Sequence, residues 1–403
     1  MFRYIKSYVL AISAIFFVSC SNPGGGIQEP GSSDSSQNPS SSAIAAQDFS
    51  RASAINKKLG RGVNLGNAFD AQCRCGTSGG WCPIAEYPYQ TALEQPGAGN
   101  GSWDGCWNNP IKDDYFEIIK ASGFNSIRLP VRWGEKASDI PPFTIPAVFT
   151  TSVKAIVDKA IAAGFPVILN IHHYNELYDD SKNRTDLELQ KQKFVELWRQ
   201  IANEFKNYSN DYLIFEVLNE PRSRITTPVL NSLLEQVWPV IRESNPERTI
   251  MINSTDWGKY SNLPYIKIPN DDANVILSGH YYNPHAFTHQ GESGNATGVK
   301  WGSADDQEKL KQEILKTYND LKAKYIGIDG GTIPVNIGEF GGSNRAAIAD
   351  RAAWINLARS EFEKYGFSWH YWAFPNGGAF DCYYYSTKTW IPEILKSLIP
   401  ETK

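Results

Sequence analysis

The stretch from Leu213 to Arg222 reads LIFEVLNEPR, an apolar run that ends in asparagine and glutamate before a proline. Apolar runs of about four to eight residues bounded by turn residues are typical of strands buried in a sheet or barrel. Side chains alternate along a strand, so Glu216, Leu218 and Glu220 point to the same side. Glu216 lies in mid-strand, where we expect it to pair with a buried cation or polar group. Glu220 lies where the strand ends.

Similar runs recur along the chain and alternate with amphipathic stretches. The predicted strands are 61–65, 126–130, 166–171, 213–218, 249–253, 275–280, 334–338 and 368–372. The predicted helices are 113–121, 152–163, 187–206, 229–243, 305–324, 346–364 and 392–398, whereas 260–272 shows no clear helix. The alternation indicates an α/β fold with parallel strands, and eight such units predict a (β/α)8 TIM barrel.

A doubly wound open sheet would give the same alternation. Residues 62–69, GVNLGNAF, belong to the first strand and the turn after it, and they lack the spacing of a dinucleotide-binding fingerprint. In a barrel the active site lies at the carboxyl ends of the strands. The long insertions 71–109 and 283–304 would both lie on that face.

The composition is consistent with one barrel-sized domain and a short appendage. The chain has 403 residues, of which 41% are hydrophobic and 13% aromatic, enough for one large core. The net charge of -4 and the pI near 5.9 supply no basic surface. The charge balance therefore points neither to nucleic acid nor to an anionic surface.

The first 20 residues resemble an export signal. Arg3 and Lys6 precede the apolar stretch 8–18, which is too short to span a bilayer, and Cys20 follows. The pattern resembles a bacterial lipoprotein signal, which implies a lipid on Cys20; a plain cleaved signal peptide is the alternative. Residues 21–50, rich in Ser, Gly and Pro, predict a flexible linker to a catalytic domain at 51–403. We expect an outer-membrane or cell-surface lipoprotein, or otherwise a secreted protein.

Five cysteines follow this segment: Cys73, Cys75, Cys82, Cys106 and Cys382. In an exported protein disulfides are the leading interpretation, and the odd count leaves one thiol over. The sequence does not define the pairing. The four cysteines between 73 and 106 could instead hold a structural zinc, although their spacing lacks paired C-x-x-C knuckles.

Polar and aromatic side chains gather at the predicted strand ends. They are Arg128 and Trp133 where the second strand ends, His172 and His173 where the third ends, Asn219 and Glu220 at the fourth, His280 and Tyr282 at the sixth, Glu339 at the seventh and Trp372 at the eighth. In a barrel all of these positions face one mouth.

Two of these residues, Glu220 and Glu339, form a pair with an evident chemical use. Glycoside hydrolysis needs one carboxylic acid to protonate the leaving oxygen and one carboxylate to stabilise or attack the anomeric carbon. The two roles need different pKa values. We expect Arg128 to keep Glu339 ionised and a filled, dry subsite to keep Glu220 protonated.

Seven segments resemble the successive signatures of glycoside hydrolase family 5, the cellulase family of retaining barrel glycosidases. In chain order they are RGVNLGNAF, GFNSIRLPVRW, VILNIHHYNE, LIFEVLNEPR, LSGHYYNPHAF, PVNIGEFGG and WHYWAF. The resemblance runs from about Gly60 to the C-terminus and is closest to endo-β-1,4-glucanase members. The LNEP and GEFG motifs are the most specific of the set.

This resemblance implies that Glu220 is the acid/base and Glu339 the nucleophile. It also implies supporting roles: Asn219 on the sugar 2-hydroxyl, Arg128 and Tyr282 on the nucleophile, His280 as a bridge towards the carboxylates, His172 on sugar hydroxyls and Trp372 as an apolar floor beneath the ring. His173 would be a structural neighbour of the site.

A metal mechanism is a further hypothesis, because barrels with histidines at strand ends are often metallohydrolases. Such barrels usually place two histidines on alternate residues of one strand, whereas His172 and His173 are adjacent and point apart. We therefore expect no catalytic metal and no cofactor.

Aromatic residues in the mouth loops favour an open cleft for a polymer. The candidates for stacking on sugar faces are Trp81, Trp103, Trp107, Trp133, Tyr174, Trp257, Tyr281, Trp301 and Trp372, of which Trp133 and Trp372 directly follow strands. We expect a monomer that cleaves β-1,4-glucan chains internally, with mixed-linkage glucan, xyloglucan or β-mannan as alternative substrates. The alternative outside the enzymes is a surface glycan-binding protein that has lost catalysis.

Overall fold

Eight parallel strands close into a barrel in the computed structural model, which describes residues 45–72, 74–75, 80–81, 107, 109–178, 186–375 and 378–401. The barrel strands are β1 (Arg61–Asn64), β4 (Ser126–Leu129), β5 (Val167–Asn170), β6 (Leu213–Glu216), β7 (Ile250–Asn253), β8 (Val275–Tyr281), β9 (Val335–Phe340) and β10 (Ser368–Tyr371). Their order is β1-β10-β9-β8-β7-β6-β5-β4, so the last strand pairs with the first. The predicted (β/α)8 barrel and its eight strands are confirmed.

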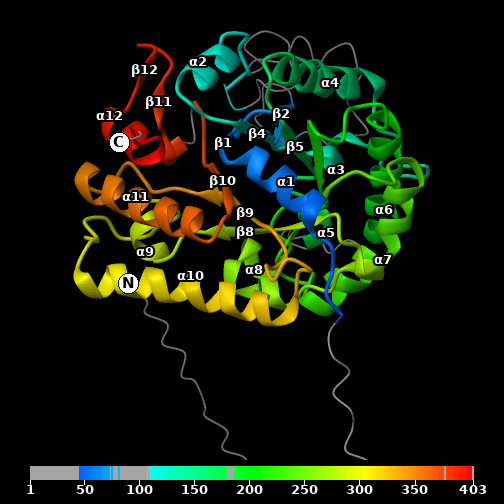
Figure 1. Cartoon of the computed structure of the whole chain (residues 1–403). Coiled ribbons are helices and arrows are strands. Elements are labelled where there is room, and N and C mark those ends of the chain that lie inside the picture. The colour runs from blue at the N-terminus through cyan, green and yellow to red at the C-terminus, as the bar shows by residue number, and fades with distance from the viewer. Residues whose placement is uncertain are drawn as a thin grey trace, which may run out of the picture. The chain divides into compact units, whose positions relative to one another are not determined.

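Helices surround the barrel wall (Figure 1). The seven predicted helices are all present, as α2 (Tyr115–Ala121), α4 (Ala147–Ala162), α6 (Leu187–Glu204), α7 (Thr227–Ser244), α10 (Ala304–Lys324), α11 (Ile348–Lys364) and α12 (Pro392–Leu398). The connection between β7 and β8 holds only the short 3₁₀ turns η3 (Tyr260–Tyr265) and η4 (Pro269–Asp271). Pro264 and Pro269 lack backbone N–H groups, which explains why no α-helix forms there.

Short elements occupy the loops. Four single-turn helices follow barrel strands: α3 (Trp133–Lys136), α5 (Asn175–Tyr178), α8 (Thr255–Gly258) and α9 (His285–Thr288). Two small antiparallel pairs, β2 (Arg74–Cys75) with β3 (Gly80–Trp81) and β11 (Tyr383–Tyr384) with β12 (Thr389–Trp390), and the turn η5 (Gly378–Phe380) complete the described elements.

Among the described α-helices longer than one turn, α1 (Ser50–Leu59) is the one that was not predicted, and it lies across the amino-terminal end of the barrel (Figure 1). Its apolar side chains Ala52, Ile55 and Leu59 pack on Ile168, Ile214, Met251 and Ile276 from the strands and form a separate buried cluster. Gln47 exchanges backbone hydrogen bonds with Ile326 (2.8 Å) and Ile328 (3.0 Å). Residues 47–50 thus belong to the barrel domain, and the linker predicted to reach residue 50 ends before them.

Strand register brings polar side chains together at the carboxyl end. Asn170 of β5 is opposite Glu216 of β6. A register shift at Gly279 and His280 of β8 then places His280 opposite Glu339 of β9. Because Asn170 and Glu216 are the last residues of their strands and His280 and Glu339 the last but one, they form the floor of the mouth instead of the apolar middle of the barrel.

Several predictions fall outside the part of the chain that the structure describes. They are the signal segment with Cys20, most of the linker, and Cys73, Cys82 and Cys106, while only the backbone of Cys75 is described. Cys382 is a buried free thiol whose Sγ lies 3.3 Å from the Ala373 carbonyl oxygen. Among the described helices, none combines the length and the apolar character needed to cross a bilayer.

Candidate active site

A cleft of about 600 Å³ lies at the carboxyl ends of the strands. Six of the predicted site residues line it: His172, Glu220, His280, Tyr282, Glu339 and Trp372. Two more, Arg128 and Asn219, are fully buried directly beneath them and are bonded to the lining residues and to each other. The strand ends therefore bring eight of the nine predicted residues to one site.

Glu339 is held by two donors. Arg128 Nη1 lies 2.9 Å from its Oε1, and the Tyr282 hydroxyl donates to its Oε2 at 3.1 Å. Both contacts favour the carboxylate form. Burial raises the pKa of Glu339, and the charges of His280 and Arg128 oppose that rise.

Glu220 projects into the same cleft from the turn after β6. Its φ is 46°, a conformation that non-glycine residues rarely adopt and that is found most often where function requires it. His280 Nδ1 lies 2.8 Å from Glu220 Oε1 and 3.6 Å from Glu339 Oε2. The facing oxygens of the two glutamates lie within 4.8 Å of each other. This is closer than the roughly 6.5–9.5 Å of inverting glycosidases and fits the shorter spacing of retaining ones.

Glu220 and His280 share a hydrogen bond, and each shifts the pKa of the other. Burial alone would raise the pKa of Glu220, but the hydrogen bond and charge of His280 outweigh it and lower the pKa. Burial disfavours charged His280, yet Glu339 and Glu220 raise the pKa of this histidine. The sequence predicts a protonated Glu220 in a filled subsite; in the structure His280 Nδ1, 2.8 Å away, favours the carboxylate form of Glu220, and the two groups titrate together.

Asn219 has a free donor beside this pair. Its Oδ1 accepts from Arg128 Nη2 at 2.6 Å, and its carbonyl oxygen accepts from the Tyr178 hydroxyl. Its buried Nδ2 has no partner among the described residues. An unpaired buried amide is costly, which indicates a ligand hydroxyl as its partner.

Trp372 and His172 form a flat wall of the cleft. Their rings are stacked, with centroids 5.8 Å apart and planes 4° apart. His172 Nδ1 lies 3.1 Å from Asn170 Nδ2, and burial lowers the pKa of His172 well below its usual value, so the ring is neutral. Gly66 contacts the Trp372 ring so closely that a Cβ would lie 2.7 Å from a ring carbon. A larger residue at position 66 would displace the wall.

The prediction that Trp133 stacks on substrate is wrong. Its side chain is only 1% exposed, donates Nε1–H to the Asn170 carbonyl oxygen at 2.9 Å and packs edge-on against Phe149. Three other aromatic candidates, Tyr174, Tyr281 and Trp301, are also buried. Trp81 and Trp103 lie outside the described side chains. Trp133 follows a strand directly, but it is also the first residue of helix α3. Its ring therefore points towards the helix layer.

Among the tryptophans whose side chains the structure describes, Trp257 and Trp107 are also exposed near the mouth. Trp257 lines the cleft, is 57% exposed and lies over the Arg222 guanidinium at 4.0 Å. Trp107 is 37% exposed, and its ring centroid lies 6.3 Å from that of His173. His173 Nε2 in turn lies 3.6 Å from Asp70 Oδ2.

Sequence reasoning missed a set of polar residues in the strands. They are Asn64, Asn170 and Asn253, each the last residue of its strand, and Ser278, which lies within β8. Asn64 Oδ1 accepts from Arg128 Nη1 at 2.8 Å, and the other three hydrogen-bond to Glu216. The signal was present, because each is a polar residue within a mainly apolar strand segment. The prediction that Glu216 pairs with a buried cation is confirmed by Arg128 Nε at 2.7 Å.

Within the described part of the chain, two groups of side chains have ligand atoms close enough for a metal ion. They are Asp70 with His172 and His173, and Glu220 with His280 and Glu339. In the second group Arg128 already supplies a positive charge 2.9 Å from Glu339. A divalent cation there would be repelled by the guanidinium.

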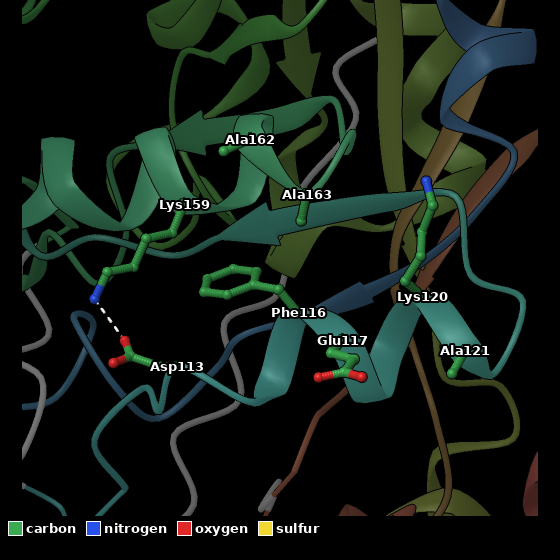
Figure 2. A pocket seen from close by; sticks show the side chains of 8 residues that line it. All are labelled: Asp113, Phe116, Glu117, Lys120, Ala121, Lys159, Ala162 and Ala163. Carbon is green, nitrogen blue, oxygen red and sulfur yellow. Dashed lines mark hydrogen bonds and ion pairs between the residues drawn. The ribbon is translucent and has the colours of Figure 1, made fainter.

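A second hollow, of about 660 Å³, lies on the helix layer between α2 and α4. Figure 2 shows the Phe116 ring between the two helices, with Ala162 and Ala163 beyond it. An ion pair between Lys159 and Asp113 (2.6 Å) closes one end. The lining comes from helix side chains and includes none of the strand-end residues.

The fold and the site together define the class: a barrel hydrolase whose mouth carries the two-carboxylate arrangement that glycosidases use. The chain belongs to glycosyl hydrolase family 5, because the sequence model of that family's cellulase domain matches residues 90–378. The family membership expected from the motifs is thereby confirmed.

Known proteins of this family resemble the chain over most of its length. Endoglucanase H of Acetivibrio thermocellus is 30% identical over 366 residues, which cover 89% of this chain and 34% of that protein. Endoglucanase A of Clostridium longisporum is 30% identical over 345 residues, which cover 82% and 60%. Cel5A of Thermotoga maritima, solved in complex with cellobiose, superposes with a TM-score of 0.72 at 35% identity and covers 86% of this chain and 99% of that one. The chain thus spans between about a third and three fifths of these two curated relatives.

Proposed function

We propose that this protein is a retaining, endo-acting glycoside hydrolase that cleaves β-1,4-glucan chains by a two-glutamate double displacement. The observation that carries the proposal is the pair Glu220 and Glu339, whose facing oxygens lie within 4.8 Å of each other and on either side of His280. The curated relatives are endoglucanases, which supports the same substrate class.

In the first step Glu339 attacks the anomeric carbon while Glu220 protonates the departing oxygen. Arg128 and Tyr282 orient the attacking carboxylate and leave one oxygen lone pair directed into the cleft. The proton comes from the carboxylic acid form of Glu220, which a filled, dry subsite favours, and Glu220 is left as a carboxylate beside His280 Nδ1–H. The bond to the leaving oxygen breaks and a glycosyl ester forms on Glu339.

In the second step water attacks the ester from the face that the leaving group vacated. Glu220 now takes the proton of that water, and the glycosyl bond to Glu339 breaks with overall retention of configuration. The free Nδ2–H of Asn219 donates to the sugar 2-hydroxyl, a contact that tightens as positive charge develops on the ring. The wall of Trp372 and His172 supports the ring from its apolar face.

The configuration of the first product tests this mechanism. Proton NMR of cellotetraose hydrolysis should show the β-anomer first and the α-anomer only by later mutarotation. An α-anomer formed first would contradict the double displacement.

Full activity after treatment with a chelator is expected, whereas loss of activity with a chelator and its recovery with a divalent metal would favour the metallohydrolase hypothesis.

The preferred glycan is a second, finer proposal. β-1,4-glucan is favoured over mixed-linkage glucan, xyloglucan and β-mannan because the relatives are endoglucanases. Mannan stays an alternative, since Thermotoga maritima Cel5A has also been solved with mannotriose. Reducing-sugar release from carboxymethyl cellulose, mixed-linkage glucan, xyloglucan and mannan ranks the four. Binding to these glycans with no reducing ends released would favour a non-catalytic binding protein.

Export and anchoring are also proposals. We propose that residues 1–20 direct export, that Cys20 carries a lipid and that the barrel acts as a monomer on polysaccharide at the cell surface. Labelling with a palmitate analogue in a bacterial host should tag the wild type and leave Cys20→Ser untagged. Equal labelling of both proteins would contradict lipidation at Cys20, and a soluble, cleaved wild type would favour plain secretion.

A further inference from the structure

Beneath the catalytic pair lies a carboxylate that the mechanism does not use. Glu216 on β6 is fully buried and is not part of the cleft lining. We infer that Glu216 is a positioning residue that orients both catalytic arms, Arg128 with Glu339 on one side and Asn253 with His280 and Glu220 on the other. The inference rests on the proposed function and deepens it.

The four contacts of Glu216 are all donors. Arg128 Nε (2.7 Å) and Asn170 Nδ2 (3.0 Å) bond to Oε2, and Ser278 Oγ (3.0 Å) and Asn253 Nδ2 (3.3 Å) bond to Oε1. An ionised carboxylate accepts about four hydrogen bonds and donates none. Burial would raise the pKa of Glu216, but Arg128 outweighs it and lowers the pKa, so the group is charged. A glutamine there would have to present an N–H to one of these donors.

The first arm runs through Arg128. Its guanidinium is a planar fork, so the bond from Nε to Glu216 fixes the direction of the other nitrogens. Nη1 then points to Glu339 at 2.9 Å and Nη2 to Asn219 at 2.6 Å. Because Glu216 balances part of the Arg128 charge, the guanidinium lowers the pKa of Glu339 less than an undivided ion pair would. The nucleophile keeps more of its basicity.

The second arm runs through Asn253. Its Nδ2 lies 3.3 Å from Glu216 Oε1 and 3.0 Å from His280 Nε2. Glu216 can only accept, so it turns the amide nitrogen of Asn253 inward and leaves Oδ1 without a partner in the described structure. With an N–H facing Nε2, the ring proton of His280 lies on Nδ1, towards Glu220 at 2.8 Å. Glu216 thereby sets the tautomer of the histidine that serves the acid.

The charged groups around the nucleophile determine the expected effect on pH dependence. Glu339 faces Arg128 from β4, His280 and Tyr282 from β8 and the turn after it, and Glu220 from the turn after β6. The acid limb of kcat/KM reports the ionisation of the nucleophile in the free enzyme. Without the negative charge of Glu216, the positive charge of Arg128 lowers the pKa of Glu339 further. The acid limb of kcat/KM therefore moves to lower pH.

The main experiment compares Glu216→Gln with Glu363→Gln. Glu363 is a matched control, because it is a carboxylate held by Arg61 Nε (2.7 Å) and Arg359 Nη1 (2.6 Å) that does not line the cleft. We expect kcat of Glu216→Gln on carboxymethyl cellulose to fall roughly 10²-fold, KM to change little and the acid limb to move down. Glu216→Asp, which keeps the charge, should hold the limb at its wild-type position. A Glu216→Gln variant that matches the control in kcat and pH profile overturns the inference.

Asn253→Ala tests the second arm and remains informative if Glu216→Gln does not fold. Asn253 links Glu216 only to the acid side, so the loss should be larger for cellotetraose than for dinitrophenyl cellobioside, which needs little protonation. Equal losses on both substrates overturn the inference. Wild-type activity is measured first. An inactive wild type overturns the proposed function and this inference with it, whereas an active wild type with unchanged variants overturns the inference alone.

Discussion

The two ends of the barrel differ in the side chains that they bury, which are mainly apolar at the amino-terminal end and include charged groups at the carboxyl end. At the amino-terminal end α1 covers the strands with a hydrophobic cluster of Ala52, Ile55 and Leu59, and the one buried polar side chain of this helix, Asn56, is uncharged. At the carboxyl end Arg128 and Glu216 are fully buried charges. Apolar burial stabilises by roughly 25 cal/mol per Å², whereas a buried ion pair contributes little net stability. The comparison teaches that stability comes from one end and chemistry from the other, and variants at the two ends should separate the two properties.

The largest effect is expected at the carboxyl end, from Glu339→Gln. Removing the attacking carboxylate should lower kcat on carboxymethyl cellulose by roughly 10⁴-fold or more. The amide oxygen still accepts from Arg128, and Glu216 still balances that guanidinium, so the urea midpoint should change little. Glu292→Gln, in the lining of the same cleft, is the control and should stay within a few-fold of wild type. Near-normal activity of Glu339→Gln would remove the nucleophile assignment.

The next effect sharpens the difference between the two glutamates. Glu220→Gln should lower kcat/KM on cellotetraose by roughly 10²–10⁴-fold, because the leaving oxygen loses its proton donor. The same variant should release dinitrophenolate from dinitrophenyl cellobioside at nearly the wild-type kcat/KM, since that leaving group needs little protonation. Parallel rate measurements on the two substrates check this. Equal losses on both would show that Glu220 is not the acid.

The third effect belongs to the amino-terminal end. Leu59→Ala removes a fully buried side chain from the cluster under α1 and should lower the free energy of unfolding by roughly 2–5 kcal/mol. kcat/KM should not change, because the cluster and the cleft share no residue. Urea denaturation and steady-state kinetics measure the two quantities. Lys57→Ala, on the exposed face of the same helix, should stay within about 0.5 kcal/mol of wild type. A loss of activity in Leu59→Ala at full folding would undo the separation of the two ends.

The sequence predicted the carboxyl end better than the amino-terminal one. Strand periodicity gave all eight strands, and the strand-end position of Glu220 and Glu339 placed both in one cleft. Helix α1 was missed because its polar residues next to a linker-like composition hid the spacing of Ala52, Ile55 and Leu59. Periodicity alone identifies an amphipathic segment, but only tertiary structure shows what covers it.

Side-chain direction was the other limit. Trp133 and Trp372 both follow strands, yet one starts helix α3 and faces the helix layer while the other lines the cleft. Chain position cannot distinguish them, because the difference lies in backbone torsions after the strand. The position of His280 between the two carboxylates was expected only from the family resemblance, because the register shift at Gly279 on which it depends cannot be read from residue spacing.

The smallest effect concerns the level between the two ends, where His370 is fully buried and polar. Its Nε2 lies 2.9 Å from Ser126 Oγ and its Nδ1 lies 3.1 Å from Asn336 Nδ2. Burial, together with the charge of Arg128, lowers the pKa of His370 to about 3. An unfolded histidine has a pKa of about 6.5. The unfolded chain therefore binds a proton between these values that the folded chain does not.

It follows that the stability contributed by neutral His370 is fully present above about pH 6.5 and is lost as the pH falls towards 3, at up to roughly 1.4 kcal/mol per pH unit. His370→Gln should remove this one-proton slope from urea denaturation curves measured at about pH 7, 6 and 5, although its absolute stability is lower. His172, whose pKa burial also lowers, keeps its own share of the slope. His289, whose pKa burial and the charge of His285 lower to about 4, keeps a further share. If the free energies of unfolding of His370→Gln and wild type fall in parallel on acidification, His370 does not contribute to the acid sensitivity. The sensitivity would then come from groups at the carboxyl end of the barrel.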